Sequence, residues 1–214
     1  NVKTIPRRVG FGAADSLDVI LDPLGIPADF DLLSIDIDGN DYHAWSAVTI
    51  YHPKIVVVEF NPTIATGVEF VQERNPRVQQ GSSISSINAL AREKQYELVA
   101  VTWNNAIFVA SEYFPAFEIA DNSIHALRDD SSGVTHFFYG YDGQVFLRGQ
   151  RSMIWHGVPL SAAMAQQLPV SLRGSPEDFG PVRSTLLKVY RRLRCIAQRV
   201  PWGASPTRGS TPKP

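Results

Sequence analysis

The chain has 214 residues, of which 44% are hydrophobic and 19% are charged, a balance typical of a globular protein with one sizeable core. No apolar run approaches the roughly 18 residues that cross a bilayer, and no secretory leader precedes the first elements, so we expect a cytoplasmic protein without a transmembrane segment. The single cysteine, Cys195, excludes an internal disulfide.

The charge is unevenly distributed along the chain. The formal net charge is −1, but the eight basic residues from Arg183 onward are accompanied by no acidic residue. The first 182 residues therefore hold 12 basic and 21 acidic side chains, a balance of −9. We interpret the basic segment as a docked terminal helix with a solvated face. Attachment to a membrane surface or to a nucleic acid is the alternative, and no clear nucleic-acid partner is expected.

Hydrophobic periodicity predicts alternating helices and strands. Apolar residues at helical spacing predict a short helix within 15–24, ahead of an apolar strand over 32–37. A helix over 41–50 leads to a second apolar strand over 54–60. A polar loop spans 61–80, a length typical of functional loops. The remaining expected elements are a helix after Ser82 or Ser83, strands over 96–102 and 106–110, a hairpin around Asp142-Gly143 within 134–148, and an amphipathic helix over 182–200.

This order of elements indicates a Rossmann-like α/β fold with a mostly parallel sheet. The last two strands of the first half are joined by a short turn, so they pair antiparallel and predict an antiparallel edge strand. The first two strands are apolar on both faces, which predicts helices on both sides of the sheet. Because strong strands begin only at residue 32, an incomplete N-terminus is expected. We divide the chain into an α/β domain (1–112), an accessory segment with a β-hairpin (113–181), a basic amphipathic helix (182–200) and a disordered tail (201–214).

Carboxylates and amides follow the two apolar strands at the point where each strand ends. Asp36 and Asp38 follow the first strand, and Glu59 and Asn61 follow the second. Ligands of doubly wound sheets bind outside the carboxyl ends of the strands, so these side chains are expected to share one crevice. The alternative is that they cap the helices that follow.

The sequence DLLSIDIDGNDY (residues 31–42), followed by Pro53 and VVVEFN (56–61), resembles the later half of FkbM-like class I methyltransferases that use S-adenosylmethionine. Gln95 stands where that family usually has glycine. The resemblance covers about residues 1–112. The other segments that agree with it are Gly81-Ser82-Ser83-Ile84, Gln95-Tyr96-Glu97-Leu98-Val99 and Asn105-Ala106-Ile107-Phe108-Val109.

The resemblance implies methyl transfer from S-adenosylmethionine to a hydroxyl or amine of a small-molecule or glycan acceptor. The family's cofactor-binding glycine turn and ribose-binding acid would precede the first residue of this chain. By position, the resemblance makes Asp36 and Asp38 catalytic and brings Asp36 and Gly39 to the cofactor. The substrate-binding residues that it implies are Asn40, Asp41, Tyr42, Glu59 and Asn61.

Two chemical roles are open for the paired acids. Methyl transfer from a sulfonium is a direct displacement, so a carboxylate need only orient or deprotonate the acceptor, and Asp36 is the expected base. Alternatively, the acids hold Mg²⁺ or Mn²⁺, which lowers the pKa of an acceptor hydroxyl.

Two other functions also remain open. Asp36-Ile37-Asp38 after an apolar strand resembles the Asp-x-Asp metal clamp of glycosyltransferases that use nucleotide sugars. The absence of a glycine turn would also suit a degenerate, non-catalytic interaction module. An EF-hand calcium loop is excluded, because counting from Asp36 places Asp41 and Ala47 where glycine and glutamate are required.

Overall fold

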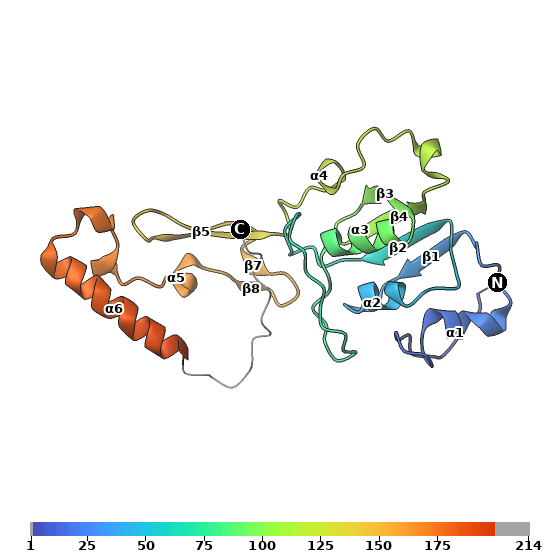
Figure 1. The fold of residues 1–214 in the computed structure, drawn as a ribbon, viewed down its shortest axis with the longest axis horizontal. Helices are drawn as coiled ribbons and strands as arrows, with labels where there is room; N and C mark the ends of the chain where they lie inside the picture. Colours follow the sequence, from blue (N-terminus) through green and yellow to red (C-terminus); the bar gives the residue numbers. More distant parts are fainter. Residues whose placement is uncertain (1, 200–214) are drawn as a thin grey trace. The chain divides into compact units, whose positions relative to one another are not determined.

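A computed structural model describes residues 2–199, and the chain divides into unit 1 (residues 1–135) and unit 2 (residues 136–214) (Figure 1). The predicted tail over 201–214 lies outside the described residues. The elements of unit 1 are α1 (Leu17–Leu21), η1 (Asp22–Leu24), β1 (Leu32–Ile35), α2 (Asp41–Ser46), β2 (Ile55–Glu59), α3 (Ile84–Glu93), β3 (Tyr96–Val101), β4 (Asn105–Ala110), η2 (Phe114–Phe117) and α4 (Ile124–Leu127). β5 (Thr135–Tyr139) begins at the boundary, and unit 2 continues with β6 (Val145–Gly149), β7 (Ser152–Met153), β8 (Val158–Pro159), α5 (Ala162–Ala165), η3 (Val170–Leu172), η4 (Pro176–Asp178) and α6 (Pro181–Arg199).

Unit 1 is a mixed α/β structure with a four-stranded sheet in the order β1-β2-β4-β3. β1 and β2 are parallel, with Ile35 opposite Val58, and β4 pairs antiparallel with both β2 and β3. The predicted hairpin of β3 and β4 is confirmed. The sheet is mixed and not mostly parallel as predicted, and the prediction that the antiparallel strand lies at the edge is also wrong. β4 lies inside the sheet, where its apolar residues Ala106 and Phe108 are fully buried between two neighbours.

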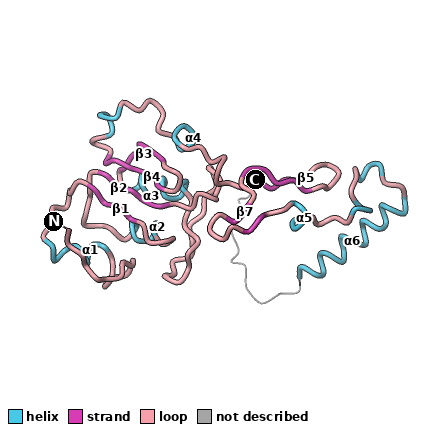
Figure 2. The backbone as a smooth tube through the Cα atoms, turned by 180° about the vertical axis from the view of Figure 1, so that it is seen from behind, coloured by secondary structure: helices cyan, strands magenta, loops and turns pink. Residues whose placement is uncertain are grey.

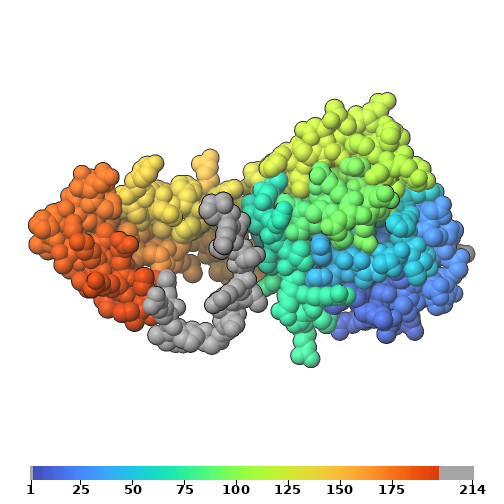
Figure 3. All heavy atoms as spheres, in the orientation of Figure 1, coloured from blue at the N-terminus to red at the C-terminus, as the bar shows by residue number. Residues whose placement is uncertain are grey.

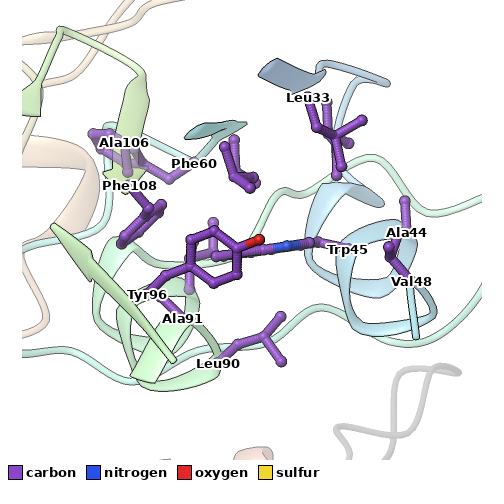
Figure 4. Close-up of a cluster of buried hydrophobic side chains, with 14 of the residues drawn as sticks. Leu33, Ala44, Trp45, Val48, Phe60, Leu90, Ala91, Tyr96, Ala106 and Phe108 are labelled. Carbon is purple, nitrogen blue, oxygen red and sulfur yellow. The ribbon is translucent and has the colours of Figure 1, made fainter. Parts of the chain in front are cut away.

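The core lies on one face of this sheet, under α2 and α3 (Figure 1). Trp45 of α2 is buried, and its ring lies 5.2 Å from that of Phe108 and 5.7 Å from that of Tyr96 (Figure 4). α3 contributes Ile84, Ile87, Leu90 and Ala91 to the same cluster. The helices predicted after each of the first two strands thus form one layer of the core.

The opposite face of β1 is open, which corrects the prediction that helices cover both sides. Along β1 exposed and buried residues alternate, and Leu32 is 55% exposed while its neighbour Leu33 is buried. Ser34 on the same face is also exposed. The apolar run therefore marks a strand that is buried on one side only.

α2 ends at Ser46 instead of the predicted Ile50. The Asp18 carboxylate accepts hydrogen bonds from the backbone N–H groups of Thr49 (2.7 Å) and Ile50 (3.2 Å). These amides are bound by a side chain of α1, so the helix does not continue through them. By contrast, β2 and α3 are joined by a long loop without helix or strand, as predicted (Figure 2).

The boundary between the units falls later than residue 112, because the segment that follows packs on unit 1. Arg128 lies 4.9 Å above the centre of the Phe60 ring. Asn122 donates a hydrogen bond of 2.8 Å to a carboxylate oxygen of Glu97 in β3. These contacts join the first part of the predicted accessory segment to the sheet.

Unit 2 contains the predicted hairpin and the predicted terminal helix. β5 and β6 pair, and the connection between them has Gly143 with a φ of +73° after Asp142, whose carboxylate accepts from the N–H of Gln144. α6 is the amphipathic helix. Among the described residues, no helix is both long and apolar enough to cross a membrane.

Candidate functional site

Three carboxylates meet where β1 and β2 end. Asp36, Asp38 and Glu59 each offer an oxygen, and these oxygens lie within 4.8 Å of one another. Because Ile35 pairs with Val58 in parallel register, the residues that follow, Asp36 and Glu59, emerge side by side. The aspartates are exposed and Glu59 is partly buried. We call these three residues the carboxylate cluster.

Glu59 is the member of the cluster with a perturbed proton affinity. Partial burial raises its pKa above the usual glutamate value, and the negative charges of Asp36, Asp41 and Asp38 raise it further. A hydrogen bond of 3.0 Å from Asn104 Nδ2 to Glu59 Oε1 opposes this rise. Asn104 lies in the turn between β3 and β4. Polar residues are common in turns, so the sequence did not indicate that Asn104 would contact Glu59.

Asp41 holds the turn that carries the two aspartates. Its carboxylate is buried and accepts backbone hydrogen bonds from Ile37 (2.9 Å) and Gly39 (2.8 Å). Burial raises the pKa of Asp41, while these two hydrogen bonds lower it. Both carboxylate oxygens are occupied by backbone amides, so the structure gives Asp41 a positioning role in place of the substrate contact expected from the sequence.

Gly39 is packed against the loop of residues 72–81. Its φ is +119°, and a Cβ there would lie 3.0 Å from Gln72 Oε1 and 3.1 Å from Gly81 N. Gln72 itself is buried, and its Oε1 accepts from the N–H groups of Gln80 (2.9 Å) and Gly81 (2.8 Å). Glycine is therefore required by backbone conformation and loop packing. Sequence reasoning missed Gln72, since a glutamine in a polar loop looks unremarkable.

Asn40 borders a pocket beside the same turn. Its Nδ2 donates to the carbonyl of Val78 (3.0 Å), whereas its Oδ1 is buried and accepts no hydrogen bond from any described residue. The pocket has a volume of about 340 Å³, near the lower end of roughly 300–1,000 Å³ for small-molecule sites. It is lined by Arg7, Arg8, Val9, Phe11, Ile37, Asn40, Pro76 and Gln79.

The pocket wall is anchored to the loop of residues 72–81. Arg74 donates a hydrogen bond of 2.6 Å to the carbonyl of Phe11 and lies 5.1 Å above its ring. His43 packs against Phe11 at 5.4 Å and is bonded through Nε2 to the carbonyl of Gln72 (2.9 Å). The ring of Tyr42 meets that of His43 edge-on. Tyr42 thus supports the wall through His43.

Asn61 is engaged within its own loop. Its Nδ2 donates to the carbonyl of Gln80 (2.6 Å), and its Oδ1 accepts from the N–H (2.9 Å) and the hydroxyl (2.6 Å) of Thr63. Asn61 therefore connects the end of β2 to the loop that packs on Gly39. The tips of the two strands do share one region, but their carboxylates, and not their amides, form the cluster.

No protein-family model, curated protein or solved structure matches this chain. Of the residues expected at the site, Asp36, Asp38 and Glu59 come together, and Asn40 lies at the neighbouring pocket. Asp41, Gly39 and Asn61 instead make the backbone and loop contacts that hold these groups in place.

Proposed function

We propose that this chain is an S-adenosylmethionine-dependent methyltransferase with a Rossmann-like sheet, acting in the cytoplasm on a hydroxyl or amine of a small-molecule or glycan acceptor. The observation that carries the proposal is the convergence of Asp36, Asp38 and Glu59 at the carboxyl ends of two parallel strands. The resemblance of residues 31–42 to FkbM-like methyltransferases supplies the reaction class.

The carboxylate cluster would act on the acceptor. A general base works best when its pKa lies near the working pH, and the raised pKa of Glu59 moves that group in this direction. Asp36 is exposed and its carboxylate lies near that of Glu59, and in this proposal Asp36 would orient the acceptor proton or remove it. Asp38 holds further negative charge beside both groups, which favours an acceptor that becomes positively charged, as an amine does when it is methylated.

The neighbouring pocket fits a polar cofactor. Arg7, Asn40 and Gln79 contribute polar side chains to the lining of this pocket, and these would pair with polar groups of a ligand. Ile37 and Phe11 provide apolar contact at the same pocket. S-adenosylmethionine, when bound, would supply the methyl group. In this proposal Asn40, which lines the pocket, would meet the cofactor, whereas Gly39 is packed against the loop of residues 72–81.

The test is methyl transfer by the full-length protein with labelled S-adenosylmethionine and a panel of hydroxyl and amine acceptors. Asp36→Asn keeps the shape and removes the charge, so we expect at least an about 100-fold loss of rate with folding intact. Glu69→Gln, an exposed acid outside the cluster, is the matched control and should be unaffected. Unchanged turnover in the Asp36 variant would remove that residue from the site.

A second candidate is a metal-dependent nucleotide-sugar glycosyltransferase. The specific observation in its favour is that Asp36 and Asp38, an Asp-x-Asp pair, direct oxygens to one place together with Glu59. Oxygen ligands of this kind suit Mg²⁺ or Mn²⁺. Binding of a uridine diphosphate sugar that requires Mn²⁺, without binding of S-adenosylmethionine, would favour this function. If the protein shows neither methyl transfer nor binding of a nucleotide sugar, the non-catalytic interaction module is the remaining function.

A further inference from the structure

Helix α6 carries an apolar stripe that is open to solvent. Its members are 50–74% exposed and recur at spacings of four and three residues, which places them on one side of the helix. The atoms of α6, orange to red in Figure 3, lie at the surface of unit 2. The stripe consists of Val182, Leu186, Val189, Leu193 and Ile196.

A different side of α6, next to the stripe, attaches the helix to the rest of unit 2, and its hydrogen bonds come from polar side chains. Arg183 donates a hydrogen bond of 2.8 Å to the carbonyl of Ser171 and lies 4.0 Å above the ring of Phe179. The Tyr190 hydroxyl donates to the carbonyl of Gln167. A helix of a globular protein normally turns its apolar side inward. α6 does the reverse, so its stripe is available to a partner.

The charge of α6 selects the partner. The helix sequence contains six basic residues and no acidic residue. Lys188, Arg191 and Arg192 are exposed. Identical helices packed through the stripe would bring only cations together, which disfavours a second copy of this chain. A polyanion such as a nucleic acid would pair with the cations and leave the apolar stripe in water.

We propose that α6 binds along the surface of an anionic lipid bilayer. The stripe would enter the boundary between headgroups and acyl chains, while the basic side chains reach the lipid phosphates. Unit 2 also exposes several large aromatic side chains, the type enriched at bilayer interfaces. A single partner helix would cover the apolar stripe of α6 but would leave these aromatic side chains in water. These aromatic residues are Phe137, Phe138, Tyr139, Tyr141 and Trp155.

The experiment is co-sedimentation of the full chain with vesicles of phosphatidylcholine alone or of phosphatidylcholine mixed with phosphatidylserine. We expect binding to the anionic vesicles, weakened when salt is raised from about 0.1 M to about 0.5 M. The double variant Lys188→Gln/Arg192→Gln should bind about 25-fold more weakly, at about fivefold for each charge removed. Arg77→Gln/Arg92→Gln, which removes two exposed charges from unit 1, is the matched control and should bind as the unaltered chain does.

The apolar contribution has its own variant. Leu186→Ser/Leu193→Ser should reduce vesicle binding by at least about tenfold, and circular dichroism would show whether the helix is retained. Equal binding to neutral and anionic vesicles, or no binding to either, would overturn the proposal. A dimer that dissociates in the leucine variant, in a chain that ignores vesicles, would also overturn it and identify a second copy as the partner.

Discussion

Asn104 donates a 3.0 Å hydrogen bond to Glu59, so the β3–β4 turn reaches across to the carboxylate at the end of β2. Asn104 in turn accepts a hydrogen bond of 3.1 Å from Asn105 Nδ2. The antiparallel register places Asn105 opposite Glu59, which explains why this turn lies at the cluster. The internal position of β4 therefore decides which polar group tunes Glu59.

Asn104→Ala should raise the pKa of Glu59 further, because the hydrogen bond that favours the ionised carboxylate is lost. The measurement is a titration of the glutamate side-chain carboxyl signals by NMR. Asn75→Ala, which removes an exposed amide bonded to Glu73, is the control and should leave Glu59 unchanged. An unaltered titration of Glu59 in the Asn104 variant would contradict this role.

Glu59→Gln should alter how stability depends on pH. Burial raises the pKa of Glu59 in the folded state, so the folded protein binds this proton more tightly than the unfolded chain. The free energy of unfolding must then fall as the pH rises from the ordinary glutamate pKa through the raised folded value. The free energy of unfolding of the variant should therefore fall less over this pH range than that of the unaltered protein.

Urea unfolding at a series of pH values measures this effect. Part of the slope should persist in the Glu59 variant, because burial raises the pKa of Asp41 in the same direction. Glu69→Gln, which removes an exposed acid outside the cluster, is the matched control for the loss of one carboxylate. Identical slopes for the Glu59 variant and the unaltered protein would show that Glu59 titrates alike in the folded and unfolded states.

Gly39→Ala should destabilise the protein more than Gly67→Ala does. Both glycines have positive φ, +119° and +90°, so each variant suffers backbone strain of about 1–2 kcal/mol. Only at Gly39 would the new Cβ also lie within 3.1 Å of backbone atoms, while at Gly67 nothing lies within 4 Å. We expect an additional loss of about 1–3 kcal/mol for Gly39→Ala, measured by urea unfolding. Equal losses would mean that the loop moves aside without cost.

Tyr96→Phe should cost about 1–2 kcal/mol, because the buried Tyr96 hydroxyl donates a hydrogen bond of 2.6 Å to the carbonyl of Pro53. Burial raises the pKa of Tyr96 to about 12, from a usual value of 10.0. Its contribution to stability is therefore present below the usual value and is lost as the pH rises through about 12. In a spectrophotometric titration of the variant, the tyrosine that ionises at a pH of about 12 should be missing. Tyr141→Phe, at a fully exposed position, should change neither stability nor the late titration.

Local sequence patterns were sufficient for β1, β2, α3 and the hairpin of β3 and β4. The apolar runs predicted β1 and β2, and the Ser83 cap with Ile84 and Ile87 predicted α3, whose cap bond from Ser86 N is present. These features depend on residues a few positions apart, which the sequence displays directly. The cofactor, the acceptor and the family resemblance stay predictions.

Side-chain periodicity and parallel pairing also determined from the sequence that Asp36 and Glu59 would lie together, because adjacent parallel strands end at the same edge. Only the tertiary structure decided that Asp41 and Asn61 hold loops, that β4 lies inside the sheet, and that α6 turns its apolar stripe outward. The reason is physical: the partners of these groups are carbonyls, amides and packing surfaces. Every residue type supplies such backbone groups, so the sequence does not mark which of them will meet.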